Sequence, residues 1–218
     1  IDINNLVIRQ FPLVRDFKEL INDFKSEKQF AENCIHAQEK INLDNQIKFF
    51  KTHHINCKIG DNSFTNKENT KATIYIVRDP RNLINSISNH YSKTLEGSYK
   101  FLTTSRFIGG GQNLGGIKKN DLLTLLGTWN DHYKFWTQNN ENLLIIKYEN
   151  LINNKKIELN KLIIFLRKYL NIEMNNQKEK NILQTTTFQY LREMEKKGLF
   201  KENAFNKSQN KKVNFFNL

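Results

Sequence analysis

Two arginines stand where a hydrophobic segment gives way to a helical pattern, in the stretch TIYIVRDPRNLINSISNHY from Thr73 to Tyr91. The guanidinium of Arg78 could give two parallel hydrogen bonds to a phosphate, and Ser86 could add a neutral donor. The start of a helix would add free N–H groups and the positive end of its dipole. The junction is therefore a candidate anion site. The alternative, which the residues alone favour, is a solvated turn in which Arg78 pairs with Asp79 or a neighbour and Ser86 is a surface residue.

A second group of candidate residues follows other short apolar segments. Lys51 and His53 come after two phenylalanines, and an imidazole that titrates near neutrality is suited to general base catalysis. The alternative is a loop histidine without a role, because the neighbouring His54 shows that a histidine can occur here by chance. Tyr148 follows LLIIK and could contact a ligand or belong to the core. Three further residues at helical spacing are interpreted as core: Trp129, His132 and Trp136.

The elements that must position these residues alternate between strand and helix patterns, which predicts an α/β fold with a parallel sheet. Strands are expected at 47–51, 73–77 and 143–148, and helices at 12–40, 80–95, 122–136, 159–170 and 176–197, the last broken near 185–187. The strand 73–77 lacks polar alternation and is expected to be buried on both faces. Pro80 suits the first turn of a helix. A glycine-rich loop is expected over 96–120 and would cover the acceptor.

The composition bounds the class of protein. The chain has 218 residues, 38% of them hydrophobic, and is predicted to form one domain over 1–218. A net charge of +12 favours anionic partners, but the basic residues are scattered, so we expect no nucleic-acid partner. Cys34 and Cys57 have neither disulfide-scaffold nor metal-ligand spacing, which indicates a reducing, cytoplasmic compartment. No stretch reaches the roughly 18–20 apolar residues of a membrane span. Because the chain starts with Ile1 and ends abruptly, we expect it to be truncated at both ends.

Four stretches together resemble the sulfotransferases that use 3′-phosphoadenosine 5′-phosphosulfate (PAPS). They are KTHHIN, YIVRDPRNLINSISNHY, GTWNDHYKFW and LLIIKYENLINN, in the order and spacing of the family, and they cover roughly residues 47–170. The resemblance implies a central parallel β-sheet flanked by helices, of the P-loop nucleotide-hydrolase-like type. It also implies transfer of a sulfuryl group from PAPS to a hydroxyl, or with lower expectation an amine, of a small molecule or glycan. It implies no metal ion.

The resemblance assigns roles to individual residues. Arg78 and Ser86 match the residues that bind the 3′-phosphate, and His53 matches the general base, with Lys51 beside it. Tyr148 matches a tyrosine that contacts the adenine. The segment QTTTFQYLREM matches a stretch that encloses the adenine, with Thr187 and Phe188 as its hydroxyl and its aromatic residue. Arg81 would add charge near the phosphate or face solvent, and Glu149 with Asn150 would cap the next helix.

The match has gaps that leave other hypotheses open. The phosphosulfate-binding loop of the family, with its lysine, glycine and hydroxyl residues, is not visible in residues 1–46. The glycine-rich loop that the family has near its C-terminus is not visible in this sequence either. One alternative is a nucleotide-dependent phosphotransferase, which would need a magnesium-binding acid at a strand end. The other is a degenerate, non-catalytic binder of a nucleotide or polyanion. The identity of the acceptor and the oligomeric state do not follow from the sequence.

Overall fold

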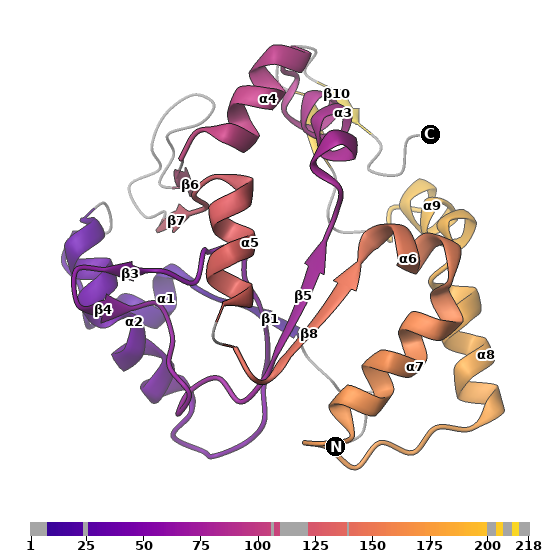
Figure 1. Cartoon of the computed structure of the whole chain (residues 1–218), viewed down its shortest axis with the longest axis horizontal. Coiled ribbons are helices and arrows are strands. Elements are labelled where there is room, and N and C mark those ends of the chain that lie inside the picture. The colour runs from indigo at the N-terminus through magenta and orange to yellow at the C-terminus, as the bar shows by residue number, and fades with distance from the viewer. Residues whose placement is uncertain are drawn as a thin grey trace. The chain divides into compact units, whose positions relative to one another are not determined.

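The computed structural model describes residues 8–23, 26–105, 107–109, 122–138, 140–199, 204–206 and 211–213 (Figure 1). The helices are α1 (Val14–Phe17), α2 (Glu27–Ile41), α3 (Pro80–Tyr91), α4 (Leu95–Thr103), α5 (Trp129–Thr137), α6 (Tyr148–Asn153), α7 (Lys155–Leu166), α8 (Asn176–Thr185) and α9 (Phe188–Lys196). The strands are β1 (Ile8–Gln10), β2 (Phe49–Lys51), β3 (Lys58–Ile59), β4 (Asn62–Ser63), β5 (Thr73–Val77), β6 (Phe107–Gly109), β7 (Leu123–Leu125), β8 (Leu143–Lys147), β9 (Ala204–Asn206) and β10 (Lys211–Val213).

The strands of the described residues are joined two by two. β1 and β2 are parallel, with Gln10 opposite Lys51, and β5 pairs with β8, whose arrow points the same way in Figure 1. The pairs β3–β4, β6–β7 and β9–β10 are antiparallel. Helices follow β1, β5 and β8 along the chain, and the α/β class predicted from the sequence is confirmed. Within the described ranges, no helix is both long and apolar enough to cross a membrane.

The chain divides into two compact units, and the division runs through β5, α4 and β8. The first unit comprises Asp2–Tyr75 and Phe101–Ile145, and the second comprises Ile76–Lys100 and Ile146–Leu218. That residues 1–218 form a single domain remains a prediction.

The first unit has an aromatic core under α1, α2 and α5. Its buried members are Phe11, Phe17, Ile21, Phe30, Cys34, Ala37, Phe64, Leu122 and Trp136. Phe17 is fully buried and its ring stacks on Phe30 at 5.3 Å between centroids. Burying one such side chain stabilises the fold by about 1.5–3 kcal/mol. This core therefore holds β2, and the segment that follows it, in place.

The helix predicted over 12–40 is interrupted in the structure. α1 ends at Phe17, and α2 starts at Glu27, because the hydroxyl of Ser26 accepts a hydrogen bond from the N–H of Gln29 and caps a new helix. The apolar spacing of the sequence is shared by both helices, so it gave no sign of the break.

The helix predicted over 122–136 starts later than expected. Leu123–Leu125 form β7, Gly127 has a left-handed backbone with φ of +66°, and Thr128 caps α5 by accepting from the N–H of Asp131. The apolar residues before Gly127 therefore belong to an extended segment. Trp129, His132 and Trp136 do lie on α5, as the spacing predicted.

Two further expectations about the chain are wrong. The strand β5 is not buried on both faces, since Ile76 is 59% exposed. The loop expected over 96–120 begins with α4, where the hydroxyl of Thr94 accepts from the N–H of Gly97 in the first turn. The strand β6 also falls within the expected loop, and residues 106 and 110–120 of that loop lie outside the described residues. Its role over an acceptor therefore remains a prediction.

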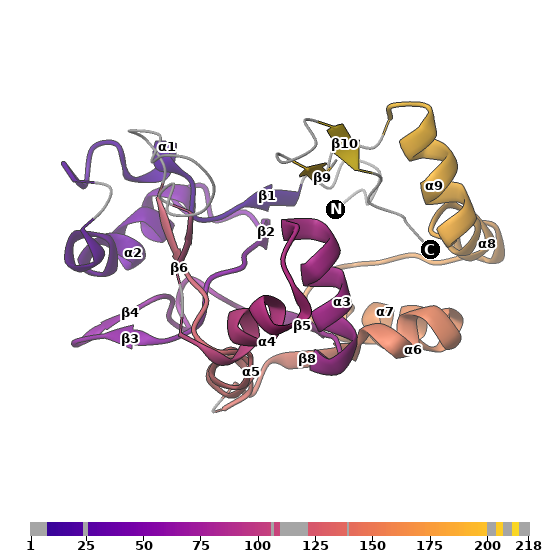
Figure 2. The ribbon, with the colours of Figure 1, turned by 90° about the horizontal axis from the view of Figure 1, so that it is seen from above.

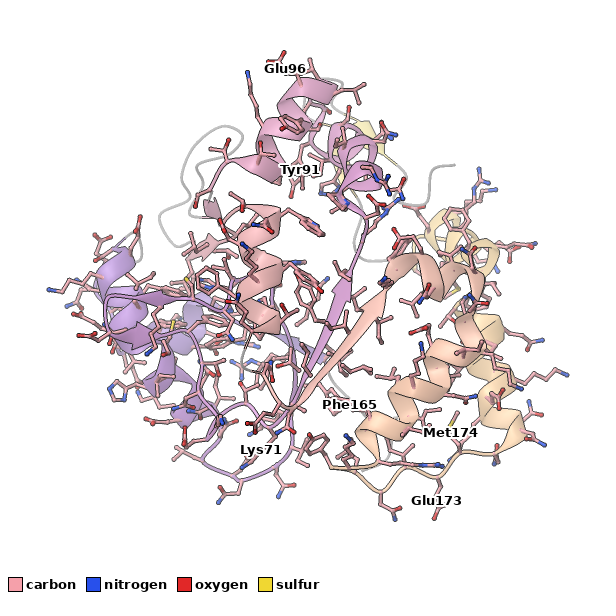
Figure 3. The ribbon with its side chains drawn as sticks, viewed as in Figure 1. Lys71, Tyr91, Glu96, Phe165, Glu173 and Met174 are labelled. Carbon is pink, nitrogen blue, oxygen red and sulfur yellow. The ribbon has the colours of Figure 1, made fainter. Side chains whose placement is uncertain are left out.

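The second unit is mostly helical. Figure 3 labels Tyr91 at the end of α3 and Glu96 in the first turn of α4. It also labels Phe165 near the end of α7 and Met174 shortly before α8. α6 leads directly into α7, and α8 into α9, as both views show (Figure 2). The break predicted near 185–187 is confirmed: α8 ends at Thr185 and α9 starts at Phe188.

Candidate functional site

The junction between β5 and α3 has the arrangement that the sequence predicted, with Pro80 as the first residue of the helix. Asp79 caps it: its carboxylate accepts from the backbone N–H of Arg81 at 2.9 Å and from the Arg81 guanidinium at 2.5 Å. These bonds, above all the side-chain bond to Arg81, lower the pKa of Asp79 to about 2. The Arg81 side chain is 87% exposed. Arg81 therefore faces solvent and neutralises the cap.

The prediction that this helix start offers free N–H groups is wrong. Pro80 has no N–H, the N–H of Arg81 is used by Asp79, and the N–H of Asn82 donates to the Asp79 carbonyl at 3.0 Å. An anion at this junction would therefore be held by side chains and not by the helix terminus.

Arg78 is not the partner of Asp79, contrary to the alternative that the residues alone favoured. Its guanidinium carbon lies 4.7 Å from the centroid of the Tyr148 ring, at the start of α6. Its Nε is buried and has no hydrogen-bond partner among the described residues. Such a contact with an aromatic face fixes the guanidinium without using its donors. The site therefore holds a positioned cation with unused hydrogen-bonding capacity.

The described residues around Arg78 form an open pocket of about 150 Å³. It is lined by Arg78, Asn82, Tyr148, Glu149, Ile152 and Asn153. This volume is smaller than the roughly 300–1,000 Å³ of pockets that enclose a whole small ligand. The pocket is suited to one charged group of a ligand, with the rest of the ligand outside it.

Glu149 gives the pocket a negative wall. Its carboxylate accepts from the backbone N–H of Asp79 at 3.0 Å, and this bond, with a weaker one from the side chain of Asn82, lowers the pKa of Glu149. The expectation that Glu149 caps the helix after it is wrong, because it lies in the first turn of α6 and ties α6 to the β5–α3 junction. No sequence pattern indicates this contact, which joins residues 70 positions apart.

Ser86 lies on the same face of α3 as Asn82, one turn further along the helix. It is half-buried, and its hydroxyl makes no hydrogen bond within the described part of the chain. Ser86 does not line the pocket itself. A ligand that reached from Arg78 along α3 would meet its hydroxyl.

Thr187 and Phe188 lie at the start of α9, outside the pocket. The Thr187 hydroxyl accepts from the N–H of Tyr190 at 3.2 Å and donates to the carbonyl of Gln184 at 3.0 Å, so it caps the helix. The ammonium of Lys155 bonds the carbonyl of Thr186, which ties this turn to the start of α7. Phe188 is half-buried. Their contact with an adenine remains a prediction.

Lys51 and His53 belong to the first unit. Lys51 ends β2, and its carbonyl accepts from the N–H of Phe11 at 3.0 Å. His53, two residues later, is exposed, whereas His54 is only 2% exposed and stacks on Phe64 at 4.2 Å. Burial lowers the pKa of His54 to about 4. Of the two histidines, His53 is the one available to a substrate.

The segment that carries His53 is held by side chains of α5. The Nε2 of His132 lies 3.3 Å from the carbonyl oxygen of His53, and the indole N–H of Trp136 donates to the carbonyl of His54 at 3.0 Å. The sequence placed both residues in the core and gave no sign of these bonds. Among the described residues, no three His, Cys, Asp or Glu side chains are grouped as metal ligands.

Comparison with known proteins supports the resemblance seen in the four stretches. Among solved structures, the chain is similar to that of mouse sulfotransferase SULT7A1 complexed with PAP, with a TM-score of 0.47 and 19% identity. The aligned part covers 71% of this chain and 51% of that chain, so it spans about half of the mouse protein's structure. No curated protein sequence matches the chain significantly. A family model described as the sulfotransferase domain matches residues 7–216. The chain belongs to the sulfotransferase domain family.

Proposed function

We propose that the protein is a PAPS-dependent sulfotransferase that acts on a hydroxyl group of a small molecule or glycan. The observation that carries the proposal is the buried Nε of Arg78, which has no hydrogen-bond partner in the part of the chain that the structure describes and lies beside a pocket that could hold one charged group. A phosphate oxygen would satisfy that donor, and family membership supports the 3′-phosphate of the nucleotide as the group.

The charges in the pocket make Arg78 decisive for anion binding. Glu149 is ionised at neutral pH, since its pKa is lowered, and Arg81 is engaged by Asp79. Without Arg78, the pocket would present a carboxylate to an incoming phosphate. Arg78 therefore has to attract the anion and offset Glu149.

The remaining roles follow from the chemistry of the side chains. PAPS, when bound, supplies an activated sulfuryl group. His53 takes the proton of the acceptor hydroxyl, as a neutral imidazole can near neutral pH. The ammonium of Lys51 offsets negative charge on the group being transferred. Ser86 donates to the phosphate bound by Arg78, and Tyr148, Thr187 and Phe188 contact the adenine.

The first experiment measures nucleotide binding by calorimetry. Adenosine 3′,5′-bisphosphate should bind Arg78→Ala more weakly by about 1.5–3 kcal/mol, the range for a hydrogen bond to a charged group. Arg81→Ala is the matched control and should bind as the wild type does, because Arg81 points to solvent. Adenosine 5′-monophosphate tests the phosphate assignment: the wild type should prefer the bisphosphate, and Arg78→Ala should lose that preference. Equal affinity of wild type and Arg78→Ala for the bisphosphate would refute the assignment.

The second experiment measures turnover with radiolabelled PAPS and a panel of phenols, alkyl alcohols, glycans and amines. His53→Ala should retain nucleotide affinity and lose about 100-fold or more in kcat, the contribution of a general base. His36→Ala, an exposed histidine of α2, is the control. Full activity of His53→Ala would remove the base role. Phosphoryl transfer from magnesium ATP, with no sulfuryl transfer from PAPS, would favour a phosphotransferase instead.

A further inference from the structure

Two side chains of the first unit, those of Tyr75 and His132, form a chain of hydrogen bonds that ends on the backbone of His53. The hydroxyl of Tyr75 lies 2.8 Å from Nδ1 of His132, and Nε2 of His132 lies 3.3 Å from the carbonyl oxygen of His53. The Tyr75 and His132 rings also stack, with centroids 5.7 Å apart. Tyr75 and His132 are 57 positions apart in the chain. Both rings are half-buried.

The direction of each hydrogen bond follows from the atoms involved. A carbonyl oxygen can only accept, so Nε2 of His132 carries the proton that bonds to His53. Burial lowers the pKa of His132, and the hydrogen bond to the carbonyl of His53 offsets only part of that effect, so the ring is neutral near pH 7. In a neutral imidazole the other nitrogen accepts, so the Tyr75 hydroxyl donates to Nδ1. Burial raises the pKa of Tyr75 to about 12, which keeps that proton in place.

The neighbouring residues are fixed in the same way. Trp136, one helical turn after His132, donates to the carbonyl of His54, and the N–H of Ile55 donates to the carbonyl of Leu125 at 2.8 Å. The N–H of His54 donates to the hydroxyl of Thr52 at 3.0 Å. Backbone groups on three consecutive residues are thus bonded, and of the four bonds named here the one to His53 comes from a titratable side chain.

We propose that His132, held in one tautomer by Tyr75, is a positioning residue that sets the backbone of His53 for proton transfer. The inference rests on the proposed function. His132 does not touch the reacting atoms; it acts through the carbonyl of His53. A side chain at 132 that keeps an N–H donor keeps the role, and one that lacks a donor loses it.

The first test is spectroscopic and needs no substrate. Long-range ¹H–¹⁵N correlation of the histidine rings in the full chain reports which nitrogen of His132 carries the proton. The inference requires the proton on Nε2 in the wild type, and a mixture of tautomers in Tyr75→Phe, whose ring lacks the donor. A wild-type ring protonated on Nδ1 near pH 7 would overturn the inference.

The second test compares substitutions at 132 in the radiolabelled PAPS assay. His132→Phe should lower kcat about 100-fold, the effect of a misplacement near 1 Å, with the nucleotide affinity unchanged. His132→Gln, whose amide can donate to the same carbonyl, should recover most of that loss. The kcat of Tyr75→Phe should lie between those of His132→Phe and His132→Gln. His36→Phe is the control. A residue with only a packing role would not be rescued by the polar glutamine.

The outcomes separate this inference from the function on which it rests. If the wild type transfers no sulfuryl group to any acceptor class, the proposed function fails and the inference fails with it. If the wild type is active and His132→Phe is equally active, or His132→Gln is as poor as His132→Phe, only the positioning role fails. Should His132→Phe not fold, Tyr75→Phe and the ring spectra still decide the matter.

Discussion

The buried imidazole of His54 predicts that acid destabilises the first unit. Its ring lies between Phe64, at 4.2 Å, and Phe30, at 5.2 Å, and its Nδ1 proton is donated to the carbonyl of Ile55 at 2.7 Å. Its Nε2 is buried without a hydrogen-bond partner among the described residues. The cavity beside it measures about 10 Å³, at the lower limit for a single water. A proton on Nε2 would therefore have no acceptor.

The size of the effect follows from the shift in the pKa of His54, from 6.5 to about 4. Between pH 6.5 and about pH 4, the unfolded chain binds a proton at His54 and the folded chain does not. The free energy of unfolding therefore falls as the pH falls through this range. The 2.5-unit difference corresponds to about 3 kcal/mol at 1.36 kcal/mol per unit. That is a large part of the roughly 5–15 kcal/mol that stabilises a typical domain.

The assay is urea denaturation followed by tryptophan fluorescence at a series of pH values from 7 down to 4. Both tryptophans of the chain, Trp129 and Trp136, lie on α5 in the same unit as His54, so the signal reports this unit. His54→Phe keeps an aromatic ring in the stack and removes the titration, and most of the loss of stability should disappear. The lowered pKa of His132 leaves a smaller slope of the same sign. An unchanged slope in His54→Phe would show that the reasoning about burial is wrong.

Three other substitutions test the local structure. Gly127→Ala should lower the free energy of unfolding by about 1–2 kcal/mol because of the left-handed backbone, and by a further amount because the new Cβ would lie 2.7 Å from Cδ1 of Ile55. Gly60→Ala is the control: its φ is +59° and the space around it is open, so in the same urea titration it should show the backbone penalty alone. Trp136→Phe should destabilise by about 1–3 kcal/mol, measured by circular dichroism, because the buried carbonyl of His54 loses its donor; no loss would mean that the bond is not formed. Thr187→Ala should cost about 0.5–2 kcal/mol and speed amide exchange at the start of α9, whereas Thr187→Ser should not, since serine keeps the capping hydroxyl; equal exchange in both would argue against the cap.

The features that the sequence predicted well are set by neighbours in the chain. Pro80 at the first helical position and the break after Thr185 depend on residues within one helical turn, where the preference of each residue type decides. The strand 143–147 is predicted almost to its ends because an uninterrupted apolar run between polar segments has few alternatives.

The features that failed depend on contacts or backbone angles that periodicity does not contain. The spacing of leucines before Trp129 fits a helix, but the left-handed conformation of Gly127 separates β7 from α5. The assignment of charges at the junction failed for a related reason. Asp79 is adjacent to Arg78 and two residues from Arg81, yet a helix cap reaches forward into its own first turn, so it binds Arg81.

The consequence for the candidate site is that residues of the same type, close together in the sequence, have opposite roles. Arg81 is neutralised at the surface, whereas Arg78 has the Tyr148 ring beside it and an Nε without a hydrogen-bond partner among the residues described. In the same way His54 is packed into the aromatic core, while His53 stays exposed on a backbone held by α5. Substitution of His54 would disturb His53 through that backbone, so a loss of turnover in a His54 variant alone would not identify the base. The base is identified by a variant that keeps the fold, the nucleotide affinity and the acid stability profile and loses only kcat, and among the two histidines only His53 can meet all of these conditions.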